Sequence, residues 1–153
     1  MKKETKEGQA NTSIRPYTTA DYREVRTTLE NVGLFYEPMD NEALLAEQIS
    51  SDPGSILVAE VDGQVVGNVL LKATGWGPLL FRLAVRNEFQ GRGIGTRLME
   101  AAEQELASRG RPEIHLLVED GETGLLAFYE SLGYEVGHTY KWMWKSLVPK
   151  SSE

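Results

Sequence analysis

The chain has 153 residues, which is the usual size of one domain and enough for a hydrophobic core. With 16 basic and 23 acidic residues the formal net charge is −7, and an acidic chain is a poor candidate for binding nucleic acid or anionic lipid. The chain has no cysteine, which excludes disulfides, thiolate metal ligands and a cysteine nucleophile. Its two histidines also disfavour a histidine-rich metal site, so we expect no metal.

No apolar run approaches the roughly 18 residues of a membrane-spanning helix, and we expect no membrane association. The first residues are charged and have no apolar stretch behind them, unlike a secretory signal. We therefore expect a cytoplasmic protein with one domain over residues 13–147. Solvated tails are expected over residues 1–12 and 148–153.

The first half of the chain carries helix and hairpin signals. Thr18 or Thr19 can cap a helix that Gly33 ends. The pair Asp62-Gly63, between two apolar runs, is the strongest short signal for a β-hairpin. In chain order the pattern predicts a strand, a helix, a loop rich in bulky side chains, a second helix and two hairpin strands, over residues 13–17, 18–33, 34–40, 41–50 and 55–73.

The second half continues the mixture of strands and helices. The pattern predicts a strand, a long helix, a strand, a short helix and a terminal strand pair, over residues 79–85, 94–110, 113–119, 123–133 and 134–147. The terminal pair would turn near Gly137 and His138. Because strands and helices are mixed and much of the sheet is joined by hairpins, the fold class is α/β, of the mixed α+β kind.

Three glycines, Gly91, Gly93 and Gly95, open the long helix. The first amides of a helix have no intrahelical acceptor, and the helix dipole adds partial positive charge at the same place. Glycines let the backbone curl there and let a phosphate approach without a Cβ in the way. The segment therefore predicts an anion site, with a tight turn and no ligand as the alternative.

Two common phosphate motifs do not fit this segment. A dinucleotide fingerprint would place its third glycine where Thr96 stands, and the chain contains no P-loop string. The pattern that fits is Q-x-x-G-x-G, formed by Gln90, Gly93 and Gly95.

The stretch "LAVRNEFQGRGIGTRLMEAAEQELASRG", followed later by "LLAFYESLGYE", resembles the acetyl-coenzyme A binding region of the GNAT N-acetyltransferase superfamily. The resemblance covers residues 13–147 and is closest to the small bacterial YpeA-like group. It implies a central, mostly antiparallel mixed sheet with a splayed strand pair, flanked by about four helices.

The resemblance also implies how acetyl-CoA would be held. Main-chain groups of the "LAV" strand would bond the pantetheine arm and the glycine-segment amides the pyrophosphate, although both stretches can equally be ordinary strand and turn. Arg92 and Arg97 would contact phosphate, or would only be solvated. The implied cofactor-binding residues are Leu83, Ala84, Val85, Gln90, Gly91, Arg92, Gly93, Ile94, Gly95, Thr96 and Tyr129.

For the chemistry, the resemblance implies direct transfer of the acetyl group to a neutral amine. The amide of Val85 would stabilise the oxyanion, and Tyr129 would protonate the leaving thiolate; the alternative for Tyr129 is a core aromatic. Relatives often have a glutamate on the "LAV" strand, which this chain lacks. Glu119 therefore becomes the first candidate base, alone or through water, with a solvated carboxylate as its alternative; Asp120 and Glu37 are further candidates. Glu122 also stands where relatives often have an asparagine, which puts one coenzyme contact in doubt.

The acceptor site is expected near residues 34–40 and the turn at Trp76, where Tyr36, Glu37 and Asp40 would receive a cationic amine. The expected activity is an acetyl-CoA-dependent N-acetyltransferase acting on a small metabolite, a protein N-terminus or a lysine. Dimers are common among relatives, so the resemblance also allows a homodimer. The alternatives are a non-catalytic acyl-CoA sensor and an interaction protein that has lost its ligand.

Overall fold

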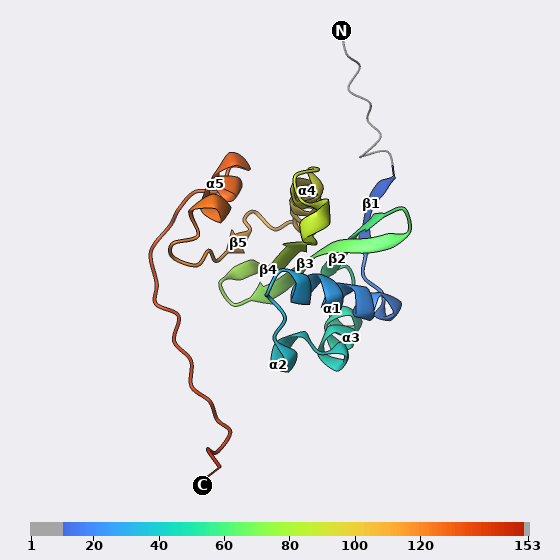
Figure 1. Cartoon of the computed structure of the whole chain (residues 1–153). Coiled ribbons are helices and arrows are strands. Elements are labelled where there is room, and N and C mark those ends of the chain that lie inside the picture. The colour runs from blue at the N-terminus through green and yellow to red at the C-terminus, as the bar shows by residue number, and fades with distance from the viewer. Residues whose placement is uncertain (1–10, 152–153) are drawn as a thin grey trace. The chain divides into compact units, whose positions relative to one another are not determined.

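The computed structural model describes residues 11–151, which divide into two compact units. The first unit ends at Leu117 and the second begins at Val118, and each is described by itself (Figure 1). The tails expected over residues 1–12 and 148–153 lie largely outside the described residues. Thr12 is already part of the first strand, one residue earlier than expected.

The first unit is built on one five-stranded sheet. The strands follow the chain order, and each neighbouring pair is antiparallel except the last, which is parallel. This mixed, mostly antiparallel sheet confirms the expected fold class. The strands are β1 (Thr12–Pro16), β2 (Ile56–Val61), β3 (Gln64–Thr74), β4 (Gly77–Val85) and β5 (His115–Leu116).

Both faces of the sheet are covered, so β2 and β3 are buried along most of their length. On one face, α1 (Tyr22–Asn31) and α3 (Glu42–Ser51) pack on a core that includes Ile56 and Val58. On the other lies α4 (Ile94–Ser108), as Figure 1 shows. No helix of the described residues is both long enough and apolar enough to span a membrane.

Local signals predicted the turns of this unit well. Asp62 and Gly63 both have positive φ, 50° and 81°, as a two-residue hairpin of this type requires. A short 3-10 turn, η2 (Thr19–Asp21), opens the first helix, and the Thr18 amide donates to the Asp21 carboxylate at 2.8 Å.

The expectation of a loop over residues 34–40 is wrong for its last four residues, which form α2 (Glu37–Asp40). Pro38 favours the first turn of a helix because its missing N–H has no intrahelical acceptor there anyway. The Asp40 carboxylate closes the turn by accepting the Tyr36 amide at 2.8 Å.

The second unit contains one helix, α5 (Thr123–Ser131), which Gly133 follows with φ 92°. The strand expected over residues 113–119 is only the two-residue β5, and the pair expected over 134–147 is absent from the described part of this unit. A strand exists only where its backbone finds a ladder partner, and Gly137-His138 is not among the residue pairs that fix a tight hairpin. Accordingly Trp142 and Trp144 are 78% and 80% exposed.

Candidate functional site

The site of the first unit starts at the edge of β4 (Figure 1). The parallel ladder with β5 covers only Leu79 and Leu80, so within this unit the edge from Phe81 to Val85 has no strand partner. The family resemblance implied a splayed strand pair here, and the ladder between β4 and β5 extends over only these two pairs of residues. The Arg86 amide donates to the Val66 carbonyl of β3 at 2.9 Å. Because successive peptides alternate in direction, the Val85 amide and carbonyl face the open edge.

A β-bulge shapes the same stretch of β4. Asn68 lies opposite Ala84 and Leu70 opposite Phe81, so β4 carries one residue more than β3 between these pairs. Arg82 lies in the bulge with φ 54°, a left-handed conformation that a bulky residue rarely adopts.

Asn68 holds the bulge from inside the core. Its side chain is fully buried, and its Nδ2 donates to the Arg82 carbonyl at 2.8 Å. Its Oδ1 has no partner among the described residues. Burying a polar group without a hydrogen bond costs free energy. The bond from Nδ2 to the Arg82 carbonyl is therefore the structural reason for an asparagine at this position.

The glycine segment then turns the chain into α4. After the 3-10 turn η3 (Asn87–Phe89), Gly91 and Gly93 have φ 77° and 81°. The first bond into the helix runs from the Arg97 amide to the Gly93 carbonyl at 3.1 Å. The amides of residues 94–96 precede this bond and therefore have no intrahelical acceptor. With the positive end of the helix dipole, they form a surface that suits an anion.

Gln90 stabilises the segment through its side chain. Its Nε2 donates to the Val85 carbonyl at 2.8 Å and to Asn87 Oδ1 at 3.2 Å, and its own amide donates to the Asn87 carbonyl at 3.2 Å. Asn87 in turn donates its amide to Asn31 Oδ1 of α1 at 2.8 Å. Gln90 therefore fixes the loop to the end of β4, a role that the motif alone did not reveal.

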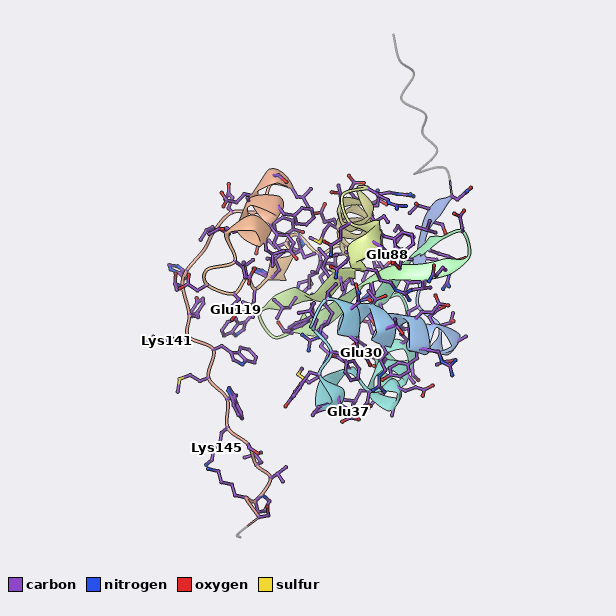
Figure 2. All side chains as sticks on the ribbon, viewed as in Figure 1. Glu30, Glu37, Glu88, Glu119, Lys141 and Lys145 are labelled. Carbon is purple, nitrogen blue, oxygen red and sulfur yellow. The ribbon has the colours of Figure 1, made fainter. Side chains whose placement is uncertain are left out.

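The arginines around the start of α4 are held by the protein. Arg92 donates to the Glu88 carbonyl at 3.2 Å and lies over the Phe89 ring at 5.0 Å from its centroid. Arg97 donates to the Thr12 carbonyl at 2.8 Å. Glu88, which is labelled in Figure 2, is exposed and lies six residues before the start of α4.

The expected acceptor residues lie at the start of α2. Tyr36 is 56% exposed, and Glu37, which is labelled in Figure 2, is also exposed. Asp40, at the end of α2, is only 2% exposed and pairs with Arg82 Nε at 3.0 Å. The segment of residues 34–40 is thereby tied to the bulge of β4. Sequence reasoning missed this pair, because only the fold brings a loop carboxylate to an arginine inside a strand.

Tyr129 and Glu119 belong to the second unit. Tyr129 is 6% exposed, and burial raises the pKa of its phenol above the ordinary value, so the phenol stays protonated at neutral pH. Its ring packs edge-on against Phe128 and Tyr134. Glu119 is exposed and lies three residues beyond the end of β5, whereas we expected it at a strand end. Its carbonyl accepts the Glu122 amide at 3.1 Å.

The described residues contain no group of three or more histidine or carboxylate side chains arranged to hold a metal ion.

Comparison with known proteins places this geometry in context. Residues 52–136 match the model of the acetyltransferase (GNAT) domain. An acetyltransferase of Pectobacterium atrosepticum is 35% identical over 122 residues, which span 80% of this chain and 86% of that protein. An acetyltransferase of Sodalis glossinidius is 33% identical over 135 residues, spanning 88% and 95%. The PaiA N-acetyltransferase of Thermoplasma acidophilum, solved with coenzyme A, matches with a TM-score of 0.75 and 20% identity over 84% of this chain and 92% of that one.

Proposed function

This chain belongs to the GNAT acetyltransferase family and is an acyltransferase, and we propose that it passes the acetyl group of acetyl-CoA directly to a primary amine. The amine would belong to a small metabolite, a protein N-terminus or a lysine. One observation carries the proposal: the open edge of β4 runs directly into a helix start whose first amides lack intrahelical acceptors. The Thermoplasma protein of similar fold was solved with coenzyme A, which supports the same ligand here.

The pyrophosphate and the pantetheine arm of the coenzyme would each bind to a different part of this site. The amides of Ile94, Gly95 and Thr96 would bind the pyrophosphate, with Gly91 and Gly93 giving the turn its shape. The main chain of residues 83–85 would bond the pantetheine arm along the open edge, as the missing partner of β4. When bound, acetyl-CoA supplies a thioester carbonyl that an amine can attack.

Val85 would donate its amide to the oxygen that becomes negative during the attack. Gln90 bonds the carbonyl of the same residue at 2.8 Å, which restrains the peptide that follows this amide before the reaction. Such preorganised donors stabilise developing charge without reorganising during the step. Holding both reactants at one edge would supply much of the acceleration by proximity.

The proton transfers are assigned to two residues of the second unit. Tyr129, kept neutral by its raised pKa, would give its proton to the departing thiolate. Glu119, acting through water, would take the proton that the attacking amine loses.

A cytoplasmic enzyme that acts alone or as a homodimer is consistent with this proposal.

One observation favours a second candidate, a non-catalytic acetyl-CoA sensor. The bulge of β4 carries an arginine, Arg82, where a base would be needed. None of the residues of β4 is an aspartate or a glutamate that could serve as that base. A sensor would bind acetyl-CoA without turnover, and it would be indifferent to the loss of the Tyr129 hydroxyl.

CoA release measured with a panel of primary amines distinguishes the two candidates. We expect turnover with at least one amine, and a loss of about 100-fold in kcat for Tyr129→Phe with little change in acetyl-CoA affinity. Phe128→Leu, which changes the neighbouring ring and leaves the hydroxyl, is the matched control. Acetyl-CoA binding without release from any amine would favour the sensor.

A further inference from the structure

Arg82 has an unusual conformation that local sequence does not explain. Of the non-glycine residues described, only Asp62 and Arg82 have positive φ, and Asp62 owes it to a hairpin turn. Arg82 lies within a strand, and its conformation is held by the bulge and by Asn68. Strained residues persist where the surrounding structure over-determines them, and they cluster at ligand sites. The conformation of Arg82 therefore points to a function of its side chain.

The guanidinium of Arg82 is bonded to the protein through only one of its five N–H groups. Its Nε donates to Asp40 Oδ1 at 3.0 Å, and across residues 11–151 its four other N–H groups have no protein acceptor. The side chain is 24% exposed, so these groups are partly shielded from water and still within reach of a ligand. An arginine fixed through Nε presents the planar fork that matches a carboxylate.

The carboxylate of Asp40, the partner of Arg82, is not available to a ligand. Asp40 is 2% exposed, and its two oxygens accept from Arg82 and from the Tyr36 amide at 2.8 Å. One carboxylate thus bonds both the guanidinium and the backbone of the segment proposed to receive the acceptor. We expected Asp40 to receive a cationic amine, but its carboxylate is already bonded to a cation of the protein, Arg82.

We propose that Arg82 binds a carboxylate of the acceptor, so that the substrate of this enzyme is an amine that also carries a carboxylate, such as an amino acid. The inference rests on the proposed function, because it places the acceptor beside the bulge of β4. It makes Arg82 a specificity-determining residue. Amines without an acidic group, polyamines above all, would be poor substrates, because they would leave the four other N–H groups of the guanidinium without an acceptor and would bring a second positive charge beside them.

The test compares amino acids with their carboxamides as acceptors, since each pair differs by one negative charge at nearly constant shape. CoA release is measured for wild type, Arg82→Gln, Arg82→Lys and the control Arg111→Gln, an exposed arginine that follows the end of α4. Wild type should prefer the best amino acid over its carboxamide by about 10- to 100-fold in kcat/KM, the usual range for a hydrogen-bonded charge pair. The preference should vanish in Arg82→Gln, return partly in Arg82→Lys and persist in Arg111→Gln.

Acetyl-CoA affinity, measured by calorimetry on each variant, separates this inference from the proposed function. An equal or better rate with the carboxamides in wild type would overturn the role of Arg82 and leave the acetyltransferase intact. That role would also be overturned if Arg82→Gln bound acetyl-CoA normally and kept the preference. If Arg82→Gln failed to fold, the wild-type comparison and Arg82→Lys would still decide, because a lysine that restores neither preference nor rate contradicts binding by charge.

Discussion

Replacing Asp40 by asparagine tests the structural tie between the acceptor segment and β4. The side chain is 2% exposed, and its carboxylate pairs with Arg82 at 3.0 Å while accepting the Tyr36 amide. Asparagine keeps the shape but removes the charge, so the guanidinium loses its ionic partner. Removing one partner of a fully buried pair costs about 3–5 kcal/mol.

The exposure of Arg82 reduces this magnitude. Its side chain is 24% exposed, so water can compensate part of the lost interaction. We therefore expect Asp40→Asn to lower the free energy of unfolding by about 2–3 kcal/mol. For a chain of this length that corresponds to a fall of about 4–12 °C in the midpoint of thermal unfolding.

Urea and thermal unfolding followed by circular dichroism measure this change, with Glu37→Gln as the matched control. Glu37 lies on the same short helix but is exposed, so its substitution should stay within about 0.5 kcal/mol of wild type. The KM of the acceptor should rise in Asp40→Asn while acetyl-CoA affinity stays the same. An Asp40→Asn protein as stable as the control, or one that loses acetyl-CoA instead, would refute the tie.

Two further substitutions test other parts of the first unit. Tyr17 is buried, its hydroxyl has no partner among the described residues, and burial raises its pKa to about 12, so Tyr17→Phe should be neutral or stabilising by about 1 kcal/mol. Because the folded-state pKa is the higher one, wild type should lose stability as pH rises from about 10 through 12, and Tyr17→Phe should lose less in urea titrations across that range. Gln90→Ala should weaken acetyl-CoA binding about 10-fold in calorimetry by freeing the Val85 carbonyl, and unchanged affinity would contradict the bracing role.

Features fixed by neighbouring residues could be predicted from the sequence. The Asp62-Gly63 hairpin and the turns at Gly91 and Gly93 depend on which residues tolerate positive φ, and both appear where expected. The anion-suited start of α4 follows from the same local chemistry, because any helix leaves its first amides without intrahelical acceptors.

Features fixed by distant residues could not be predicted. The Arg82 bulge depends on Asn68, 14 positions away, and its charge is met by Asp40, 42 positions away. Nothing in the local pattern of β4 marks Arg82 for a left-handed conformation. The expectation of a strand pair over residues 134–147 was wrong for a related reason. An alternating pattern shows that a strand could form, but it does not show that a partner strand is aligned with it.

The central claim is that the start of α4 binds the pyrophosphate of acetyl-CoA, and calorimetry on three proteins tests it most directly. Wild type is compared with Gly93→Asp and Gly93→Asn, which share the strain of a side chain at φ 81° and differ only in charge. We predict that wild type binds acetyl-CoA, that Gly93→Asn binds more weakly, and that Gly93→Asp loses at least about 10-fold more. Equal affinity for the two variants, or no binding by wild type, would contradict this claim.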